Sequence, residues 1–245
     1  MPGSTYARAE APETRPANRD ADVSRIAALL ADPSRAAMVF AVGDGRALPA
    51  GELARHAGIA RSTASEHLGK LVAGGLLSVE RHGRHRYYRL NGPDVAEALE
   101  ALAVLAPPRP TRDYREESAG RAIHRARTCY DHLAGWLGVE ITDALVEHGH
   151  LDLTGRTYDL TASGSALFRT LGVEPTELAA GRRHFARACL DWSERRYHLA
   201  GALGAALTEA LFDTGWVERM DATRAVRVTN EGRRAIRRVF GVRVF

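Results

Sequence analysis

The sequence of 245 residues contains only two cysteines, and none of its apolar runs approaches the ~20 residues of a membrane-spanning helix. Two cysteines are too few for a disulfide framework, so a small disulfide-stabilised secreted fold is excluded. The N-terminus lacks the apolar segment of a signal peptide, which predicts a cytoplasmic protein that does not contact a membrane. The composition that remains, 45% hydrophobic and 26% charged, predicts an ordinary globular chain of one or two domains.

Motifs for nucleotide binding and covalent chemistry are also missing. The sequence has no phosphate-binding glycine loop, no dinucleotide fingerprint and no nucleophile elbow. A cysteine nucleophile is the only enzymatic alternative, and nothing beyond Cys and His in one segment supports it. We therefore do not expect an enzyme, and the sequence indicates no certain cofactor. The net charge of +4 is mildly basic, and one arginine-rich stretch accounts for much of it.

The most informative stretch runs from Leu48 to Leu90. Its apolar spacing predicts a helix that ends at Gly58, a tight turn, and a second helix that begins at Arg61. Gly74-Gly75 ends the second helix. Alternating residues on both sides of the turn at His82-Gly83-Arg84 then predict a two-stranded wing.

Such an arrangement is typical of DNA-binding proteins, because a helix held steeply against its predecessor can enter a major groove. One face of the second helix carries short or polar side chains, and the wing carries basic ones that can contact phosphates. The alternative is a small helical hairpin with a solvated basic loop. We interpret His67 as a DNA contact, although packing at the helix end is the other reading. The predicted DNA contacts are Arg61, Ser62, Thr63, Ser65, Glu66, His67, Lys70, Arg81, Arg84, His85 and Arg86.

Several motifs in residues 23–105 are shared with a known family. They are residues 31–35, residues 52–54, the pattern Ser62-x-x-Ser65-x-His67-Leu68-x-x-Leu71, residues 73–77 and the return strand 84–90. On these residues the stretch resembles the ArsR-type winged-helix repressors of bacteria. The resemblance implies a repressor that forms a homodimer through the terminal helices of this domain. The two recognition helices would then reach half-sites about one DNA turn apart.

The same resemblance bears on metal sensing. ArsR-like metal sensors often carry cysteines on the first helix of the helix-turn-helix, or carboxylates and histidines on the last helix. Residues 48–57 contain no cysteine here, and residues 94–105 contain no histidine. Neither of those metal sites is supported, so any sensing is assigned to the C-terminal half.

The predicted fold class is mainly α with small β-hairpin wings (α+β). Residues 1–21 are predicted to be a disordered tail, and residues 22–106 a winged helix-turn-helix DNA-binding domain. Residues 107–113, rich in proline, form a stiff linker. Residues 114–245 form a sensor and dimerisation domain.

The C-terminal part contains an internal repeat, with copies at about 114–174 and 175–242. Residues 132–149 and 198–215 align at a shift of 198 − 132 = 66, with 10 identities in 18 positions. Upstream, residues 124–131 align with 184–191 at a shift of 60, so the second copy carries an insertion of 66 − 60 = 6 residues. Each copy is predicted to be helix, helix, hairpin, helix. Because the hairpin tips are far less basic than the first wing, we expect a pseudo-symmetric pair with a cleft between the copies, not a second DNA-binding site.

Both copies share the motif His-x-Ala-Arg-x-Cys-x-Asp, which would place His, Arg and Asp on one face if it were helical. The residues are interpreted either as core groups and helix-tying ion pairs, or as an effector site. The effector could react with a low-pKa thiol, or be a metal ion held by Cys, His and Asp, or be a small molecule stacked on tryptophan. The absence of a close Cys-x-x-Cys or His-x-x-x-His pair weakens the metal reading. The candidates are His124, Arg127, Cys129, Asp131, His132, His184, Arg187, Cys189, Asp191 and Trp192.

The sequence as a whole therefore predicts a homodimeric, sequence-specific DNA-binding transcriptional regulator, most simply a repressor. Its expected partners are double-stranded DNA and a second copy of the chain. The C-terminal repeat would sense the effector. The alternative is an architectural DNA-binding protein that has no effector and binds without sequence preference.

Overall fold

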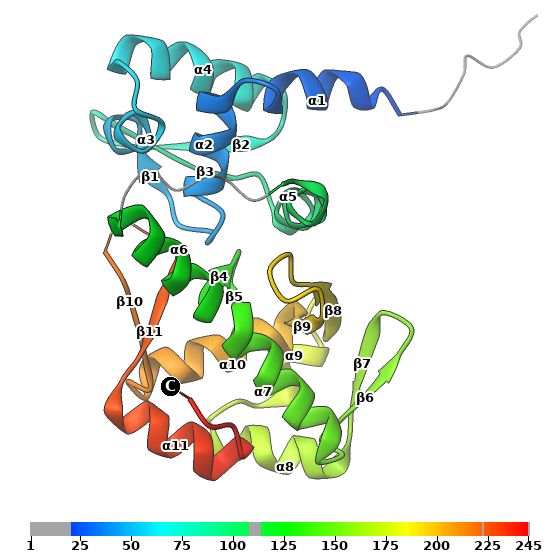
Figure 1. Ribbon diagram of the computed structural model, residues 1–245. Coiled ribbons are helices and arrows are strands. Elements are labelled where there is room, and N and C mark those ends of the chain that lie inside the picture. Colours follow the sequence, from blue (N-terminus) through cyan, green and yellow to red (C-terminus); the bar gives the residue numbers. More distant parts are fainter. Residues whose placement is uncertain (1–20, 108–113, 222, 245) are drawn as a thin grey trace, which may run out of the picture.

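The computed structural model describes residues 21–107, 114–221 and 223–244 (Figure 1). Almost all of the predicted tail, and residues 108–113 of the predicted linker, lie outside the described residues. The described residues form two large hydrophobic cores and a small third cluster of Cys129, Ala134, Cys189 and Ala200. One large core is built from Met38 to Leu99 and the other from Ala126 to Val242. We call the corresponding parts the N-terminal domain (21–107) and the C-terminal domain (114–244).

The N-terminal domain is a helix-turn-helix with a wing, as predicted. Its elements are α1 (Val23–Leu30), α2 (Pro33–Ala41), β1 (Leu48–Pro49), α3 (Ala50–Ala57), α4 (Arg61–Ala73), β2 (Leu77–His82), β3 (His85–Leu90) and α5 (Pro93–Leu105). Helix α2 begins where Asp32 accepts the N–H of Arg35 at 2.9 Å, with Pro33 at the first helical position. Gly58, with φ of +66°, allows the sharp turn between α3 and α4.

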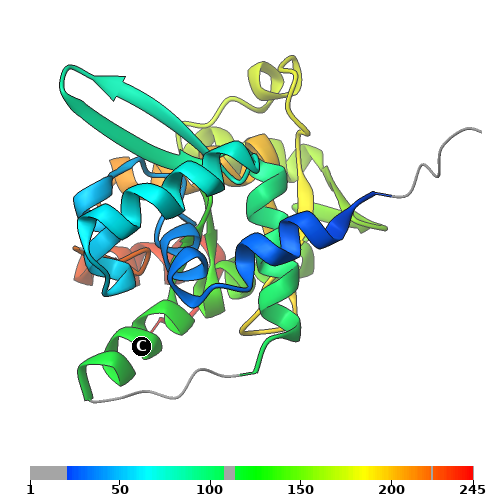
Figure 2. The same cartoon turned by 90° about the horizontal axis from the view of Figure 1, so that it is seen from above.

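The small antiparallel sheet of this domain has the strand order β1-β3-β2. Helices α2, α3 and α4 bury Leu53, Leu68 and Leu71 completely, which fixes the angle of α4 against its neighbours. The opposite face of α4 is left at the surface. From above, the β2–β3 wing projects well beyond the helices (Figure 2).

The C-terminal domain begins with α6 (Tyr114–Arg125) and then runs twice through hairpin, helix, hairpin, helix. The first run is β4 (Arg127–Cys129), β5 (His132–Ala134), α7 (Gly135–Glu147), β6 (Leu151–Thr154), β7 (Thr157–Leu160) and α8 (Ala162–Thr170). After α9 (Pro175–Ala179), the second run is β8 (Arg187–Leu190), β9 (Tyr197–Ala200), α10 (Gly201–Asp213), β10 (Val217–Arg219), β11 (Val226–Val228) and α11 (Asn230–Phe240). None of the described helices is long and apolar enough to cross a membrane.

The order helix, helix, hairpin, helix predicted for each copy is wrong, because it omits the first hairpin, and the shared His-x-Ala-Arg-x-Cys-x-Asp motif is not helical over its length. In each copy the motif leaves the preceding segment and enters a β-hairpin, β4–β5 or β8–β9. The first hairpin turns at Tyr130-Asp131, where Tyr130 has a φ of +59°. Its N–H donates to the carbonyl oxygen of Gly43 in the N-terminal domain at 2.7 Å. This turn contains neither glycine nor asparagine, the residues that usually indicate such a turn in a sequence. Long-range contacts therefore stabilise it.

The two copies exchange strand contacts. The second hairpin of the first copy joins the first hairpin of the second copy in the sheet β6-β7-β8-β9, where Tyr158 donates its N–H to the oxygen of Ala186 at 3.3 Å. The reciprocal contact is the N–H of Val226 to the oxygen of Ala126, at 2.9 Å. Because each copy completes the other, a pseudo-two-fold axis passes between the β4–β5 and β8–β9 hairpins.

Equivalent threonines repeat this symmetry inside the domain. The N–H of Leu199 donates to Oγ1 of Thr142 at 2.9 Å, and the N–H of Leu133 donates to Oγ1 of Thr208 at 2.8 Å. All of these groups are buried. Each helix, α7 or α10, thus satisfies a backbone donor of the other copy's hairpin.

Candidate functional site

The exposed face of α4 carries most of the side chains predicted to contact DNA. Ala64, Leu68 and Leu71 point into the core, which leaves the remaining face to solvent. A salt bridge of 2.7 Å between Lys70 and Glu66 spans one turn of that face. The exposed predicted residues of α4 are Arg61, Ser62, Thr63, Ser65, Glu66 and Lys70.

His67 differs from its neighbours on α4. Its side chain is only 13% exposed, and Nδ1 lies 3.4 Å from Oδ1 of Asp32, the residue that caps α2. The alternative reading, packing at the helix end, therefore fits this position better than a base contact does.

The wing presents a basic surface. In its register Arg81 is opposite Arg86 and His82 is opposite His85, while Arg84 lies at the turn. The four predicted wing contacts, Arg81, Arg84, His85 and Arg86, are all exposed.

The two tyrosines of the return strand point to opposite faces of the sheet, because side chains alternate along a strand. Tyr88 is buried, whereas Tyr87 is only partly buried and packs edge-on against His82 at a ring distance of 5.8 Å. Arg89 forms an ion pair with Glu80 on the neighbouring strand. That cation is consequently less available for phosphate than the three arginines nearer the turn.

Among the described residues, one group of four Cys and His side chains lies on the pseudo-two-fold axis. We call it the Cys2His2 cluster, and it consists of Cys129, His132, Cys189 and His198. Each pair faces its partner across a hairpin, Cys129 opposite His132 and Cys189 opposite His198. One sulfur or ring nitrogen from each of the four side chains lies within 4.8 Å of the others, and all four residues are buried. Two thiols and two imidazoles at this spacing can serve as ligands for one metal ion.

Sequence reasoning missed His198, although the repeat aligned it with His132. The six-residue insertion separates Cys189 from His198 by nine positions, whereas Cys129 and His132 are three apart. In both hairpins strand pairing places the cysteine opposite the histidine, whatever the length of the loop that joins the two strands. Treating His198 as a candidate because it aligns with the candidate His132 would have identified the fourth residue.

The surroundings set the protonation of the cluster. The hydrogen bond with Cys189, together with burial, raises the pKa of the Cys129 thiol well above its ordinary value. Burial lowers the pKa of His198 well below its ordinary value, so its imidazole is neutral. Burial also acts to lower the pKa of His132, but Cys129 and Asp131 outweigh it and raise that pKa to about 9. A low-pKa thiolate at Cys129, as a redox sensor would need, does not fit this setting.

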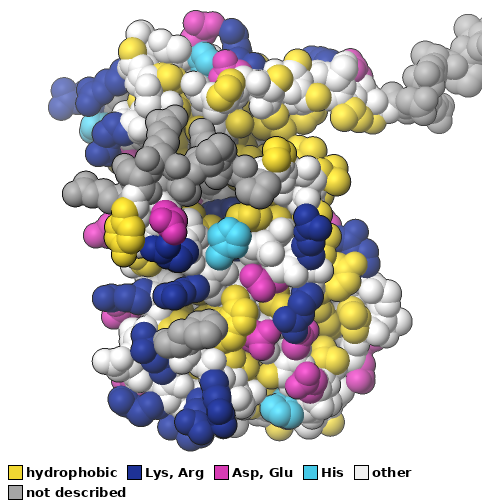
Figure 3. All heavy atoms as spheres, viewed as in Figure 1, with side chains coloured by type: hydrophobic (Ala, Val, Ile, Leu, Met, Phe, Trp, Pro, Cys, Tyr) yellow, Lys and Arg dark blue, Asp and Glu magenta, His cyan; other side chains and the backbone are white. Residues whose placement is uncertain are grey.

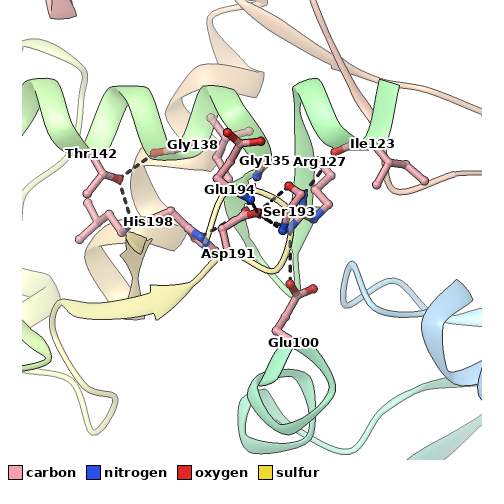
Figure 4. Close-up of polar contacts among 12 residues, drawn as sticks. Glu100, Ile123, Arg127, Gly135, Gly138, Thr142, Asp191, Ser193, Glu194 and His198 are labelled. Atoms are coloured by element: carbon pink, nitrogen blue, oxygen red, sulfur yellow. Dashed lines mark hydrogen bonds and ion pairs between the residues drawn. The ribbon is translucent and has the colours of Figure 1, made fainter. Parts of the chain in front are cut away.

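A buried ion-pair network connects the cluster to the N-terminal domain (Figure 4). Oδ2 of Asp191 lies 3.5 Å from Nδ1 of His198 and 2.9 Å from Nη2 of Arg127. The guanidinium of Arg127 is 0% exposed and reaches Oε2 of Glu100, on α5, at 3.4 Å. Burial raises the pKa of Asp191, but Arg127 outweighs this and holds it well below its ordinary value. The carboxylate is therefore ionised and fixed between the two copies.

Two glutamates of α5, one turn apart, each pair with equivalent arginines from both copies. Glu100 contacts Arg127 and Arg224, the latter at 2.7 Å. Glu97 contacts Arg187 and, at 3.2 Å, Arg156. Helix α5 thus lies across the pseudo-two-fold axis of the C-terminal domain.

The remaining predicted effector residues lie around the cluster, outside it. His124 and His184 are exposed, and Arg183 pairs with Asp131 at the surface. The ring of Trp192 stacks on Arg127, 4.8 Å from the guanidinium carbon, and contacts His124 edge-on. The structure therefore separates a buried Cys/His set from a ring of polar neighbours.

A cavity of about 180 Å³ lies between α5 and the cysteine hairpins. Its walls include Cys129, His132 and Cys189, and on the other side Glu97 and His184. A small ion or molecule could reach the cluster from this space.

Apolar side chains remain exposed on the outer helices of the N-terminal domain. Val23 and Ile26 of α1 and Leu102 and Leu105 of α5 are all more than one third exposed, with Leu105 at 82%. Hydrophobic atoms are visible along α1 and over α5 in Figure 3. Seen from above, α1 crosses over α5 (Figure 2).

Comparisons with known proteins agree with this geometry. Residues 30–80 match a family model described as a helix-turn-helix domain. The "Uncharacterized HTH-type transcriptional regulator YdfF" of Bacillus subtilis is 44% identical over 223 residues, which cover 91% of this chain and 99% of that protein. The "HTH-type transcriptional regulator CmtR" of Mycobacterium bovis is 38% identical over 87 residues, which cover 36% of this chain and 73% of that protein.

Among solved structures, a homodimeric winged helix-turn-helix DNA-binding domain from Mycobacterium bovis, titled a possible ArsR-family regulator, is 31% identical. The match covers 34% of this chain and 76% of the chain in that structure, with a TM-score of 0.32. The predicted helix-turn-helix of the N-terminal domain is confirmed, and the relatives similar to this chain are described as HTH-type transcriptional regulators. The similar proteins are transcriptional regulators and not enzymes.

Proposed function

Because this chain belongs to the HTH-type transcriptional regulators, we propose that it is a homodimeric, sequence-specific DNA-binding repressor whose C-terminal domain responds to an effector. The observation that carries the proposal is the exposed polar face of α4 beside an arginine-rich wing. A helix of this kind can contact base edges, while the wing contacts phosphates. Such a regulator would act in the cytoplasm on double-stranded DNA.

The exposed apolar side chains of α1 and α5 support the homodimer. In ArsR-like proteins the terminal helices of this domain form the dimer, and these two helices expose Val23, Leu102 and Leu105 here. A two-fold interface through them would remove that apolar surface from water. It would also present two α4 helices to half-sites about 34–36 Å apart.

The position of α5 supports an effector response. The same helix supplies the exposed apolar residues and the glutamates that bind the C-terminal domain. An effector that changes the C-terminal domain can therefore shift the dimer between DNA-binding and non-binding geometries. A coupling of roughly 1–3 kcal/mol between effector and DNA would suffice for regulation.

The test is fluorescence anisotropy with a DNA fragment from upstream of the protein's own gene. The double variant Arg84→Ala, Arg86→Ala should bind every fragment more weakly and show a flatter salt dependence, by roughly one unit of slope per lost phosphate contact. The control variant Arg234→Ala, Arg238→Ala removes the same charge from exposed positions on α11 and should bind like the wild type. Equal losses in both variants would remove the wing from the DNA interface.

The same assay decides between the repressor and an architectural DNA-binding protein. The repressor should prefer its own upstream fragment to a scrambled fragment of equal length and composition. Equal affinity for both fragments would favour the architectural protein.

A further inference from the structure

The Cys2His2 cluster has the features of a metal site. Its members come from two equivalent hairpins that meet on the pseudo-two-fold axis, so each copy contributes one cysteine and one histidine. The rings of His132 and His198 stack with their centres 5.1 Å apart. In a tetrahedral zinc site with sulfur ligands at about 2.3 Å, neighbouring ligand atoms are roughly 3.5 Å apart. The present spacing, within 4.8 Å, needs only small movements to reach that geometry.

Unpartnered polar atoms also indicate a ligand. Nε2 of His132 and both ring nitrogens of His198 are buried without a hydrogen-bond partner. Buried imidazoles are normally hydrogen-bonded, because leaving a desolvated polar nitrogen unsatisfied is unfavourable. A metal ion bound to the two Nε2 atoms would satisfy both of them, while Nδ1 of His198 lies 3.5 Å from Oδ2 of Asp191.

Each histidine has a carboxylate beside its other ring nitrogen. Oδ1 of Asp131 lies 3.4 Å from Nδ1 of His132, and Oδ2 of Asp191 lies 3.5 Å from Nδ1 of His198. Histidines that bind metals commonly donate the second N–H to a carboxylate, which fixes the ring and its tautomer. A carboxylate occupies this position in both copies, with a hydrogen bond to the ring in the first.

We propose that the Cys2His2 cluster binds one ion of the zinc group, Zn²⁺ or Cd²⁺, and that the bound ion changes DNA affinity through α5. Two thiols and two imidazoles favour tetrahedral ions of this softness. On binding, the two thiols and any protonated imidazole release their protons, and the two resulting thiolates balance the double charge of the ion. Four protein ligands leave no open position, so the site is regulatory or structural and not catalytic.

The regulatory half of the inference rests on the proposed function. Asp191 contacts both the ligand His198 and Arg127, and Arg127 contacts Glu100 of α5. An ion that draws the two hairpins together moves Asp191, and with it the buried ion pairs that hold α5. Because α5 belongs to the N-terminal domain, this contiguous set of contacts can couple the site to DNA binding.

The first experiment uses Co²⁺ as a spectroscopic probe of the reduced, chelator-treated, full-length protein. We expect one Co²⁺ per chain, with thiolate-to-metal charge-transfer bands and the visible bands of tetrahedral coordination. Zn²⁺ or Cd²⁺ should displace it and abolish the bands. Saturation without thiolate bands, or no saturable binding, would overturn the metal site.

Matched variants identify the ligands. Cys189→Ser and His198→Gln should lose the bands, whereas His184→Gln, at an exposed residue that lines the same cavity, should keep them. Because a cluster variant could unfold, thiol alkylation of the wild type provides a second measurement. Zn²⁺ should protect both cysteines from alkylation, and equal alkylation with and without Zn²⁺ would contradict the proposal.

The last experiment separates the site from its regulatory role. Zn²⁺ should change the affinity for the preferred fragment by at least about fivefold in the wild type, and by less in Glu100→Gln, which should still bind Co²⁺. If Co²⁺ binds but Zn²⁺ leaves DNA affinity unchanged, the site stands and the coupling through α5 is wrong. If neither the apo nor the Zn²⁺-loaded protein binds any DNA fragment, the proposed function fails while the Co²⁺ result still decides the site.

Discussion

The two glutamates of α5 make chemically identical contacts in very different surroundings. Glu100 and its arginines, Arg127 and Arg224, are almost completely buried. Glu97 lies at the edge, and its partner Arg156 is 63% exposed. Equivalent residues of a repeat therefore form a buried ion cluster on one side of the axis and a solvated one on the other.

The six-residue insertion in the second copy explains part of the difference. In that loop the N–H groups of Ser193 and Glu194 donate to Oδ1 of Asp191, at 2.9 and 3.1 Å. The first copy has no such loop, and its equivalent Asp131 pairs with Arg183 at the surface. The Cys2His2 cluster is thus pseudo-symmetric, but its buried connection to the N-terminal domain runs through the second copy's Asp191 only.

The largest expected effect separates the two arginines of the shared motif. Arg127→Ala leaves Asp191 and Glu100 as buried carboxylates without their common partner, which should cost about 3–5 kcal/mol of unfolding free energy. The equivalent Arg187→Ala removes a partly exposed ion pair and should cost about 1 kcal/mol or less. Urea denaturation in the presence of chelator measures both. Equal losses of unfolding free energy in the two variants would show that burial does not distinguish the Glu100 ion pairs from the Glu97 ion pairs.

Two substitutions with intermediate expected losses of stability test a contact that is alike in the two copies. Thr142→Val and Thr208→Val each leave a buried backbone N–H, of Leu199 or Leu133, without its acceptor. Each should destabilise the protein by about 1–3 kcal/mol. Because the two environments match, the losses should agree within about 0.5 kcal/mol by the same denaturation assay. A larger difference would limit the pseudo-symmetry to the backbone.

The smallest loss of stability is expected at the solvent-exposed ion pair between Arg156 and Glu97. Arg156→Ala should reduce stability by about 0.2–1 kcal/mol at low salt, and the loss should shrink as salt screens the pair with Glu97. The equivalent Arg224→Ala removes a buried partner of Glu100, so its loss should be larger and nearly independent of salt. Denaturation at two salt concentrations checks this. A loss at Arg224 that falls with salt as it does at Arg156 would contradict the comparison.

The local patterns of the N-terminal domain were sufficient to predict its helices and its wing, but not the two-residue strand β1. The cap at Asp32, the turn at Gly58 and the apolar stripe of α4 each act within a few residues, and neighbouring helices reinforce them. The wing followed from alternation around a glycine turn. His67 was harder to interpret, because its partner Asp32 lies on another helix.

The C-terminal domain was less predictable because long-range pairing decides it. The Arg-Thr-Cys segment of the motif has no strong helical or strand period, and its turn at Tyr130 depends on the carbonyl of Gly43. Both cysteines and His132 were identified as candidates. Their convergence with His198 was not, because a hairpin spacing differs from the short spacings of familiar metal motifs.

The reciprocal strand contacts also constrain when the chain can fold during synthesis. Arg127, in the first hairpin of the C-terminal domain, is bridged to Ala225, close to the end of the chain. All the buried residues of the winged helix-turn-helix core lie before residue 107, and only Tyr130 of the C-terminal domain packs against that core, so most of it can form while the rest is being translated. The first copy must wait for the last hairpin, since contacts this distant in sequence form slowly. On the ribosome, a DNA-binding domain would therefore exist before the part that is proposed to control it.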